Sequence, residues 1–172
     1  MTVGFVGLGR MGLPMARNLV ADGVDVVGAD LDDERKRALA DAGGRTADSI
    51  ADAVADADVA ITVLRTPEQV LGVAEALLPA MDEGGLWIDM SSIDPLTSES
   101  VAELAAEEGI RSVDAPVSGG VSGAEAGTLS VIAGGDEDDV DEARALFEPM
   151  AETVFHVGAT GAGQTVKLAN QL

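Results

Sequence analysis

Short apolar runs alternate along the chain with longer stretches in which apolar residues recur at helical spacing. Short runs are typical of buried strands, and the longer pattern is typical of helices that bury one face. Strands are predicted at Val3–Val6, Asp25–Ala29, Val59–Leu64, Leu86–Asp89, Arg111–Asp114, Leu129–Ala133 and Thr153–Val157, with a short one near Arg45–Thr46. Helices are predicted at Gly12–Ala21, Asp33–Ala42, Ser49–Ala55, Pro67–Leu78, Pro95–Glu108 and Val140–Met150. This alternation indicates a doubly wound α/β fold, with helices on both faces of a mostly parallel sheet.

A last helix is predicted over Gly163–Leu172, where Val166, Leu168, Ala169 and Leu172 supply the apolar positions. Neither a C-cap glycine nor a closing charge pattern follows them. We therefore expect this helix to lead elsewhere.

Charge and composition narrow the class of protein. The 172 residues include 10 Lys and Arg against 31 Asp and Glu, a formal net charge of −21. Such a surface repels phosphate backbones and anionic lipids, which argues against nucleic-acid and membrane partners. Because there is no cysteine and only one histidine, His156, we expect no metal site and interpret His156 as structural. No apolar stretch reaches the roughly 18 residues of a membrane helix, and no basic segment opens the chain, so a cytoplasmic protein is expected.

The first predicted strand runs directly into Gly7–Gly12, which reads Gly-Leu-Gly-Arg-Met-Gly, and a predicted helix follows. In that context the spacing is the Rossmann dinucleotide fingerprint. Gly7 permits a tight turn, Gly9 lets the backbone approach a pyrophosphate, and Gly12 lets the helix pack closely on the strand. The helix start offers N–H groups to the phosphates. Cofactor contacts are therefore expected from Gly7, Leu8, Gly9, Arg10, Met11 and Gly12, the alternative being a glycine-rich turn without a ligand.

Asp30 ends the second predicted strand, 18 residues after Gly12. An acidic residue there binds the ribose hydroxyls of NAD and repels the 2′-phosphate of NADP. No arginine follows immediately, since basic residues begin only at Arg35. We therefore expect NAD as the cofactor and regard NADP as the lesser alternative. A helix-capping or solvated acid is the other interpretation of Asp30.

Three segments together resemble the β-hydroxyacid dehydrogenase family, which includes 3-hydroxyisobutyrate dehydrogenase and tartronate semialdehyde reductase. They are Gly7–Leu19, then Asp114–Gly120 with the sequence Asp-Ala-Pro-Val-Ser-Gly-Gly, then Gly163–Gln171 with Lys-Leu-Ala-Asn. The similarity covers the whole chain in the family's order. It implies an NAD-dependent oxidoreductase that transfers a hydride between nicotinamide and a small 3-hydroxy acid, of the 3-hydroxyisobutyrate or 2-hydroxy-3-oxopropionate type.

The resemblance also implies residue roles. Lys167 would be the general acid and base, and Asn170 would orient the substrate or the lysine. Relatives often carry the amide one residue later, so Gln171 is the alternative to Asn170. The substrate carboxylate would be bound by Ser118, Gly119 and Gly120, and further cofactor contacts would come from Leu64, Arg65, Gln69 and Ser92. Arg65 departs from the family, which usually has proline there.

Residue chemistry agrees with these roles. Oxidising a 3-hydroxy acid requires a positioned base for the hydroxyl proton, and Lys167 lies in the least charged stretch of the chain. The Ser118–Gly120 segment can bind a carboxylate through its backbone N–H groups and the serine hydroxyl. The plainer alternatives are a solvated helix lysine and a flexible strand-to-helix loop.

Family members continue past this helix into an all-helical domain. We therefore expect residues 1–160 to form an NAD(P)-binding Rossmann domain and residues 161–172 to begin an interdomain helix leading to an all-helical C-terminal domain absent from this chain. The isolated chain should then bind NAD without turnover, and the full-length protein should be a homo-oligomer. The alternatives are an imine reductase, against which Lys167 argues, and a non-catalytic dinucleotide-binding module.

Overall fold

The computed structural model describes residues 1–171, and Leu172, counted above in the last predicted helix, lies outside the described residues. Its strands are β1 Thr2–Val6, β2 Asp25–Ala29, β3 Arg45–Thr46, β4 Val59–Thr62, β5 Leu86–Asp89, β6 Arg111–Asp114, β7 Val117–Ser118, β8 Leu129–Gly134 and β9 Ala151–Gly158. Its helices are α1 Gly12–Ala21, α2 Asp33–Asp41, α3 Ile50–Val54, α4 Pro67–Leu77, the 3₁₀ turn η1 Leu78–Ala80, α5 Pro95–Glu107, α6 Gly120–Ala126, α7 Glu137–Phe147 and α8 Ala162–Asn170.

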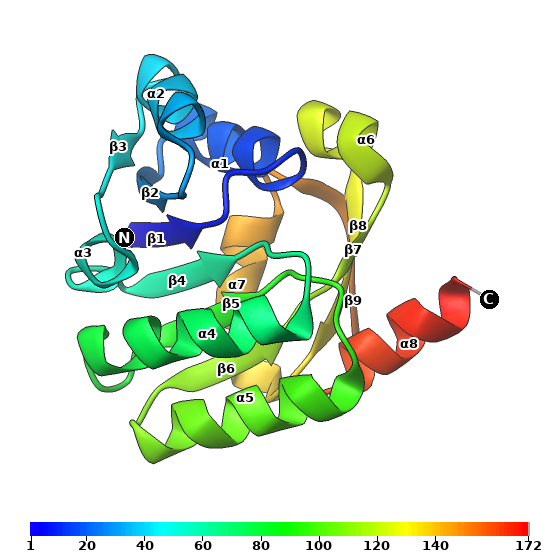
Figure 1. Ribbon diagram of the computed structural model, residues 1–172. Coiled ribbons are helices and arrows are strands. Elements are labelled where there is room, and N and C mark those ends of the chain that lie inside the picture. The colour runs from blue at the N-terminus through cyan, green and yellow to red at the C-terminus, as the bar shows by residue number, and fades with distance from the viewer. Residues whose placement is uncertain (172) are drawn as a thin grey trace.

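These strands form one sheet in the order β3-β2-β1-β4-β5-β6-β8-β7, with β9 paired to β8 (Figure 1). Pairing is parallel from β3 through β6, antiparallel where β8 meets β6 and β7, and parallel again between β8 and β9. The order 3-2-1-4-5-6 is that of a doubly wound Rossmann sheet. The predicted α/β class, mostly parallel and covered on both faces, is confirmed.

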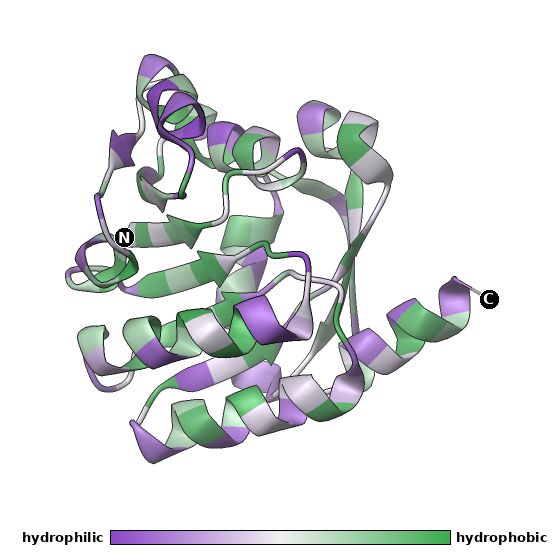
Figure 2. Ribbon diagram, in the orientation of Figure 1, coloured by the Kyte–Doolittle hydropathy of each residue, from purple (hydrophilic) through white to green (hydrophobic). Residues whose placement is uncertain are grey.

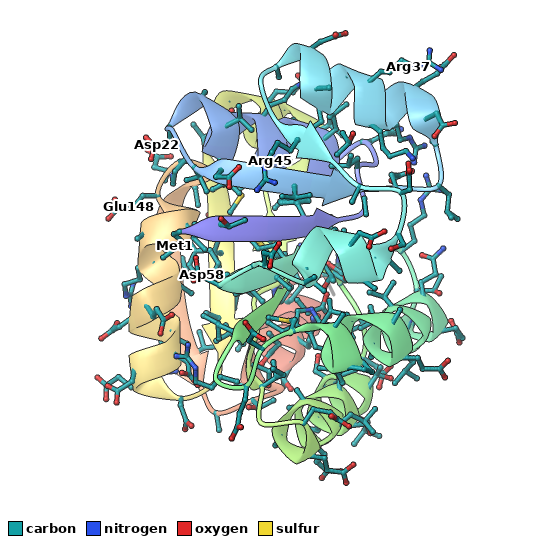
Figure 3. The ribbon with its side chains drawn as sticks, turned by 90° about the vertical axis from the view of Figure 1, so that its left-hand side faces the viewer. Met1, Asp22, Arg37, Arg45, Asp58 and Glu148 are labelled. Atoms are coloured by element: carbon teal, nitrogen blue, oxygen red, sulfur yellow. The ribbon has the colours of Figure 1, made fainter. Side chains whose placement is uncertain are left out.

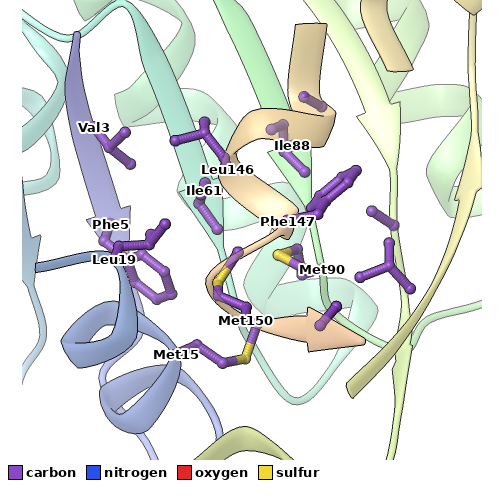
Figure 4. Packing of buried hydrophobic residues seen from close by; sticks show 14 of the residues in the cluster. Val3, Phe5, Met15, Leu19, Ile61, Ile88, Met90, Leu146, Phe147 and Met150 are labelled. Atoms are coloured by element: carbon purple, nitrogen blue, oxygen red, sulfur yellow. The ribbon is translucent and has the colours of Figure 1, made fainter. Parts of the chain in front are cut away.

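Each face of the sheet has its own hydrophobic core, because side chains alternate between faces along each strand. Along β5, Leu86 and Ile88 join the cluster that contains α1, α6 and α7, while Trp87 joins the cluster under α3, α4 and α5. Figure 4 shows the first cluster, with Phe147 and Met150 packed over the strands. In Figure 2 the strands are largely apolar and the outward helix faces polar, which is the pattern predicted from spacing.

Two elements near the carboxyl edge were not predicted. The short strand β7 and the helix α6 lie between the predicted strands Arg111–Asp114 and Leu129–Ala133, where no element is predicted. Both are too short, and α6 too rich in small residues, for periodicity to reveal them. Helix α7 begins at Glu137, ahead of the predicted Val140, since the acidic residues before it suit a helix start. The predicted C-terminal helix is present as α8.

Polar side chains cap the starts of several helices and form bonds at the amino edge of the sheet. At the start of each of the helices α2 to α5, an N-cap side chain accepts a hydrogen bond from a backbone N–H of the first turn. These caps are Asp32, Ser49, Thr66 and Asp94, in that order. At the amino edge, where Figure 3 labels Met1, Arg45 and Asp58, Arg45 pairs with Asp25 at 2.7 Å and the Thr2 N–H donates to Asp58. Doubly wound sheets bind their ligands at the opposite, carboxyl edge.

One buried carboxyl group lies within the core itself. The Trp87 indole donates to Thr62 Oγ1 at 3.0 Å, and that hydroxyl donates to Asp89 Oδ1 at 2.7 Å. No hydrogen-bond partner for Asp89 Oδ2 is found among residues 1–171. Burial raises the pKa of Asp89 above its ordinary 3.8, against the lowering effect of its bonds to Ser91 and Thr62.

We expect Asp89→Asn to raise the free energy of unfolding at pH 7, because Asn keeps the acceptor for Thr62 and removes a buried charge. The native state binds the Asp89 proton more tightly than the unfolded state, so the wild type loses stability as the pH rises through the raised pKa. The advantage of Asn should therefore shrink at lower pH. Urea unfolding at several pH values measures it. Asp89→Ala also removes the acceptor of the Thr62 hydroxyl, so it should lower the free energy of unfolding at every pH. An Asn variant less stable than the wild type at pH 7 would contradict this account.

Candidate functional site

A cavity of about 250 Å³ opens where the carboxyl ends of β4, β5 and β7 meet helix α8. Doubly wound sheets bind ligands at this edge, beside the point where the strand order reverses, which here lies between β1 and β4. In Figure 1 both strands point toward the side on which α6 and α8 lie. The lining residues are Met11, Val63, Leu64, Arg65, Met90, Ser91, Ser92, Val117, Ser118, Gly119, Gly120 and Lys167.

The structure thus gathers many of the predicted site residues around one cavity, although they lie far apart in the sequence. Those that line it are Met11, Leu64, Arg65, Ser92, Ser118, Gly119, Gly120 and Lys167. Of the lining residues two are cationic, Arg65 and Lys167, and none is acidic, in a chain whose net charge is −21. The cavity therefore suits an anionic ligand.

Among the glycines of the first loop, two are required for internal packing. Gly7 has φ +97°, and a Cβ there would overlap the Val63 carbonyl oxygen. A Cβ on Gly12 would overlap the Gly7 carbonyl oxygen. At Gly9 a Cβ would meet nothing within 4 Å, so this glycine borders open space. The loop is therefore tight on its inner side and free of side-chain bulk on its outer side, as a close approach to phosphate requires.

Helix α1 begins differently from the four helices that follow it. Its N-cap residue Met11 makes no side-chain cap hydrogen bond, and no acidic residue lies in its first turn. An uncapped helix start without acids presents N–H groups and the positive end of the dipole to an anion. Together with the open Gly9, this start fits the pyrophosphate of a dinucleotide. Leu8, in contrast, turns its side chain into the core.

Asp30 is bonded to the glycine loop. Its Oδ2 accepts the Leu8 N–H at 2.7 Å and its Oδ1 accepts the Asp32 N–H at 2.8 Å. Arg35, five residues later in the sequence, lies 3.6 Å from Oδ1 and also pairs with Asp32. The separation in sequence predicts that this arginine lies away from Asp30, but the first turn of α2 places its guanidinium beside the Asp30 carboxylate. Asp30 thus both joins β2 to the loop and places a carboxylate at the end of β2.

The loops after β4 and β5 form the wall opposite the glycine loop. Ser91 Oγ accepts the Leu64 N–H at 2.9 Å, which joins the two loops. Gln69 Oε1 accepts the Arg65 N–H at 3.0 Å, so this side chain is bonded to its own loop and does not line the cavity. Ser92 lines the cavity and is exposed.

The segment Ser118–Gly120 turns from β7 into α6. Gly119 and Gly120 have φ values of +131° and +64°, in the region that favours glycine. A Cβ on Gly120 would meet nothing within 4 Å. Helix α6 has no side-chain cap and no acid in its first turn. The exposed backbone of this turn faces the cavity beside the Ser118 side chain.

Helix α8 brings Lys167 to the cavity and leaves the two candidate amides outside it. Lys167 is only 8% exposed, and none of residues 1–171 forms a hydrogen bond or ion pair with its side chain. Asn170 and Gln171 are exposed and do not line the cavity, so the geometry does not choose between them.

Two residues without a predicted role hold α8 in place. Asp114 Oδ1 accepts the Gly161 N–H at 2.8 Å, and its Oδ2 accepts the Gln164 N–H at 3.0 Å. Burial raises the pKa of Asp114, and these backbone bonds oppose that rise. The Gln164 side chain is bonded to the loop after β5. Asp114 and Gln164 both lie inside the segments that carry the family resemblance, and this location is the sequence signal that could have identified them.

Other candidate chemistry is structural. His156 Nε2 lies 2.9 Å from the Gly135 carbonyl and 3.0 Å from that of Gly158, in keeping with a structural imidazole. Within residues 1–171 no cluster of three or more His, Asp or Glu side chains could hold a metal ion. In the same residues, no helix is long and apolar enough to cross a membrane.

Comparisons with known proteins agree with this geometry. A "Probable 3-hydroxyisobutyrate dehydrogenase" of Mycobacterium bovis is 43% identical over 171 residues, which cover 99% of this chain and 58% of that protein. An NAD-dependent L-serine dehydrogenase of Pseudomonas aeruginosa is 41% identical, over 98% of this chain and 57% of that protein. The solved structure of Mycobacterium tuberculosis 3-hydroxyisobutyrate dehydrogenase with L-serine has a TM-score of 0.97 at 44% identity, covering 98% of this chain and 58% of the other.

This chain therefore spans little more than half the length of these relatives. The family model described as the NAD binding domain of 6-phosphogluconate dehydrogenase matches residues 2–158, from β1 to the end of β9. It contains the glycine loop, the uncapped α1 and the carboxyl-edge loops described above. On this match and on the relatives' identity over nearly the whole chain, this chain belongs to the family of the NAD binding domain of 6-phosphogluconate dehydrogenase.

Proposed function

We propose that this protein is an NAD-dependent oxidoreductase acting on a short 3-hydroxy acid, with Lys167 as its general acid and base. The observation that carries the proposal is a buried lysine in the wall of a cavity that has a second cation and no acid among its lining residues. A 3-hydroxy acid brings both groups that such a cavity requires: a carboxylate and a hydroxyl whose proton must be removed. The names of the relatives, 3-hydroxyisobutyrate and L-serine dehydrogenases, support the same substrate class.

The residues divide between cofactor and substrate. The glycine loop and the start of α1 would hold the pyrophosphate, and Asp30 the ribose hydroxyls. Leu64, Arg65 and Ser92 would contact the cofactor from the opposite wall. NAD supplies the hydride acceptor for oxidation, or the hydride donor in its reduced form.

Proton transfer and carboxylate binding fall to this chain's own groups. The Lys167 amine would take the hydroxyl proton during oxidation, and its ammonium would return a proton to the carbonyl oxygen during reduction. The Ser118 hydroxyl and the N–H groups of Gly119 and Gly120 would bind the carboxylate. Asn170 or Gln171 would orient the substrate or the lysine. A buried Lys167 also argues against the imine reductase alternative.

Turnover by the protein that the complete gene encodes tests the proposal. We expect NADH formation with at least one of 3-hydroxyisobutyrate, L-serine and glycerate, and none with lactate, whose hydroxyl is one carbon closer to the carboxylate. Absence of turnover with every 3-hydroxy acid would refute the function.

Replacing Lys167 with Ala in that protein should lower kcat by roughly 10²–10⁴-fold, the usual loss for a general acid or base. The dissociation constant for NAD should stay near the wild-type value, because the phosphates are bound at the other end of the cofactor. Lys167→Arg should fail almost as badly, since guanidinium does not release its proton near neutral pH. Measuring kcat and NAD affinity in parallel tests the role of Lys167. An Ala variant that keeps its turnover would show that Lys167 is not the general acid and base.

Gly9→Ala and Gly12→Ala should separate binding from folding. The Gly9 side is open, so we expect an unfolding free energy close to wild type and NAD affinity weakened by roughly tenfold or more, about 1.4 kcal/mol. Gly12→Ala should lower the free energy of unfolding by about 1–3 kcal/mol or more, because its methyl group overlaps the Gly7 carbonyl. Calorimetric titration and urea unfolding of both variants test the pair, and normal NAD binding by the Gly9→Ala variant would contradict the assignment.

NAD should bind at least about tenfold more tightly than NADP, a difference of about 1.4 kcal/mol. Asp30→Asn should narrow the gap, because it removes the charge that repels the 2′-phosphate while keeping an acceptor for the Leu8 N–H. Asp30→Ala should also narrow the difference in affinity. It should weaken the binding of both cofactors, since it removes the bond that holds the glycine loop through the Leu8 N–H. Titrations of both cofactors against the three proteins provide the comparison, and equal NADP binding by the wild type would overturn it.

A further inference from the structure

Gln164 lies one helical turn before Lys167, on the same inward face of α8. The two are three residues apart and therefore neighbours on the helix surface. Gln164 is fully buried and Lys167 nearly so, whereas Thr165, Val166 and Leu168 are exposed. A buried amide is costly unless both of its polar atoms are bonded, so its bonds have to explain its position.

Both ends of the Gln164 amide bind the loop after β5. Its Oε1 accepts the Ile93 N–H at 3.1 Å, and its Nε2 donates to the Ser91 carbonyl at 2.7 Å. A flipped amide would place donor against donor and acceptor against acceptor, so only this orientation satisfies the loop. Ser91 also lines the cavity, and its Oγ accepts the Leu64 N–H. A continuous path of hydrogen bonds thus runs from the loop after β4, through the loop after β5, to α8.

This side chain makes the last hydrogen bonds that join α8 to the rest of the described chain. Asp114 holds the first turn through the N–H groups of Gly161 and Gln164. Among residues 1–171, no side-chain hydrogen bond from a position after Gln164 reaches another element, since Thr165 Oγ1 donates within its own helix. Besides the close packing of Gly163 on the Ile132 carbonyl, the side-chain hydrogen bonds that place α8 and Lys167 are those of Asp114 at the helix start and of Gln164.

We propose that Gln164 is a positioning residue for the proton transfer assigned to Lys167, holding the lysine in register with the cavity wall formed by the loops after β4 and β5. This rests on the proposed function. The amide acts on the reaction through α8 and touches neither substrate nor cofactor. Its contribution should appear in kcat rather than in cofactor affinity, because the phosphates are bound at the opposite end of the site.

Substituting Gln164 with side chains of similar length, Met and then Glu, separates the effect of its hydrogen bonds from the effect of its volume. Gln164→Met fills the space and removes both bonds. We expect kcat to fall by about 10–100-fold, the loss typical of misplaced catalytic groups, with NAD affinity near wild type. Thr165→Val, one residue away on the outer face of α8, is the matched control and should keep the wild-type kcat.

Gln164→Glu adds a readout that a purely structural role would not produce. Ionised Glu still accepts the Ile93 N–H but sets a second carboxylate oxygen against the Ser91 carbonyl. Protonated Glu can donate to that carbonyl and restore both bonds. Burial raises the pKa of a carboxyl group, so protonation occurs as the pH falls toward the weakly acidic range. The ratio of the Glu variant's kcat to the wild-type kcat should therefore rise as the pH falls, while the same ratio for the Met variant stays flat.

The protein encoded by the complete gene should be used for kinetics, with hydrogen exchange measured on the same samples. Gln164→Met should speed exchange at the Ile93 amide and across Ala162–Asn170, and leave α1 unchanged. Wild-type kcat in the Met variant, wild-type exchange in these segments, or a pH-independent Glu ratio would each overturn the positioning role alone. Failure of the wild type to oxidise any 3-hydroxy acid would instead overturn the proposed function, and the positioning role with it.

Discussion

The start of α1 packs on the loop after β1 so closely that no side chain fits between them, and the rest of the site depends on that constraint. A Cβ on Gly12 would overlap the Gly7 carbonyl, and one on Gly7 would overlap the carbonyl of Val63 in the loop after β4. The same close approach brings the start of α1 to the edge where β4 and β5 end. Because this helix start has neither a side-chain cap nor an acid, its N–H groups are left for an anion.

The other half of the site is assembled by buried polar groups together with close packing, since a Cβ on Gly163 of α8 would overlap the Ile132 carbonyl oxygen. Asp114 binds the first turn of α8, and the Gln164 amide binds the loop after β5. Hydrogen bonds are directional, so they fix the rotation and height of a helix more precisely than apolar contact does. This matters because α8 is exposed along much of its surface beyond Lys167.

Charge is distributed so that the acidic excess does not enter the cavity. Asp32 and Asp94 cap helices, and the described cavity lining contains Arg65 and Lys167 but no acid. The formal net charge of −21 therefore does not describe the cavity, where an anionic ligand would meet a locally cationic wall. Composition alone supported an argument about large surfaces and could not describe the lining of this cavity.

The sequence by itself determined the parallel α/β layers, since the period of apolar residues decides which faces are buried, and it located the glycine loop and Asp30 because their spacing is local. It did not reveal β7 and α6, whose few small residues carry no period. Tertiary structure alone decided that Arg35 returns to Asp30, that the Gln69 side chain binds the Arg65 N–H, and that Gln164 joins α8 to the loop after β5. Each of these depends on where separate elements meet, and a linear pattern cannot specify the contacts between residues that chain folding brings together.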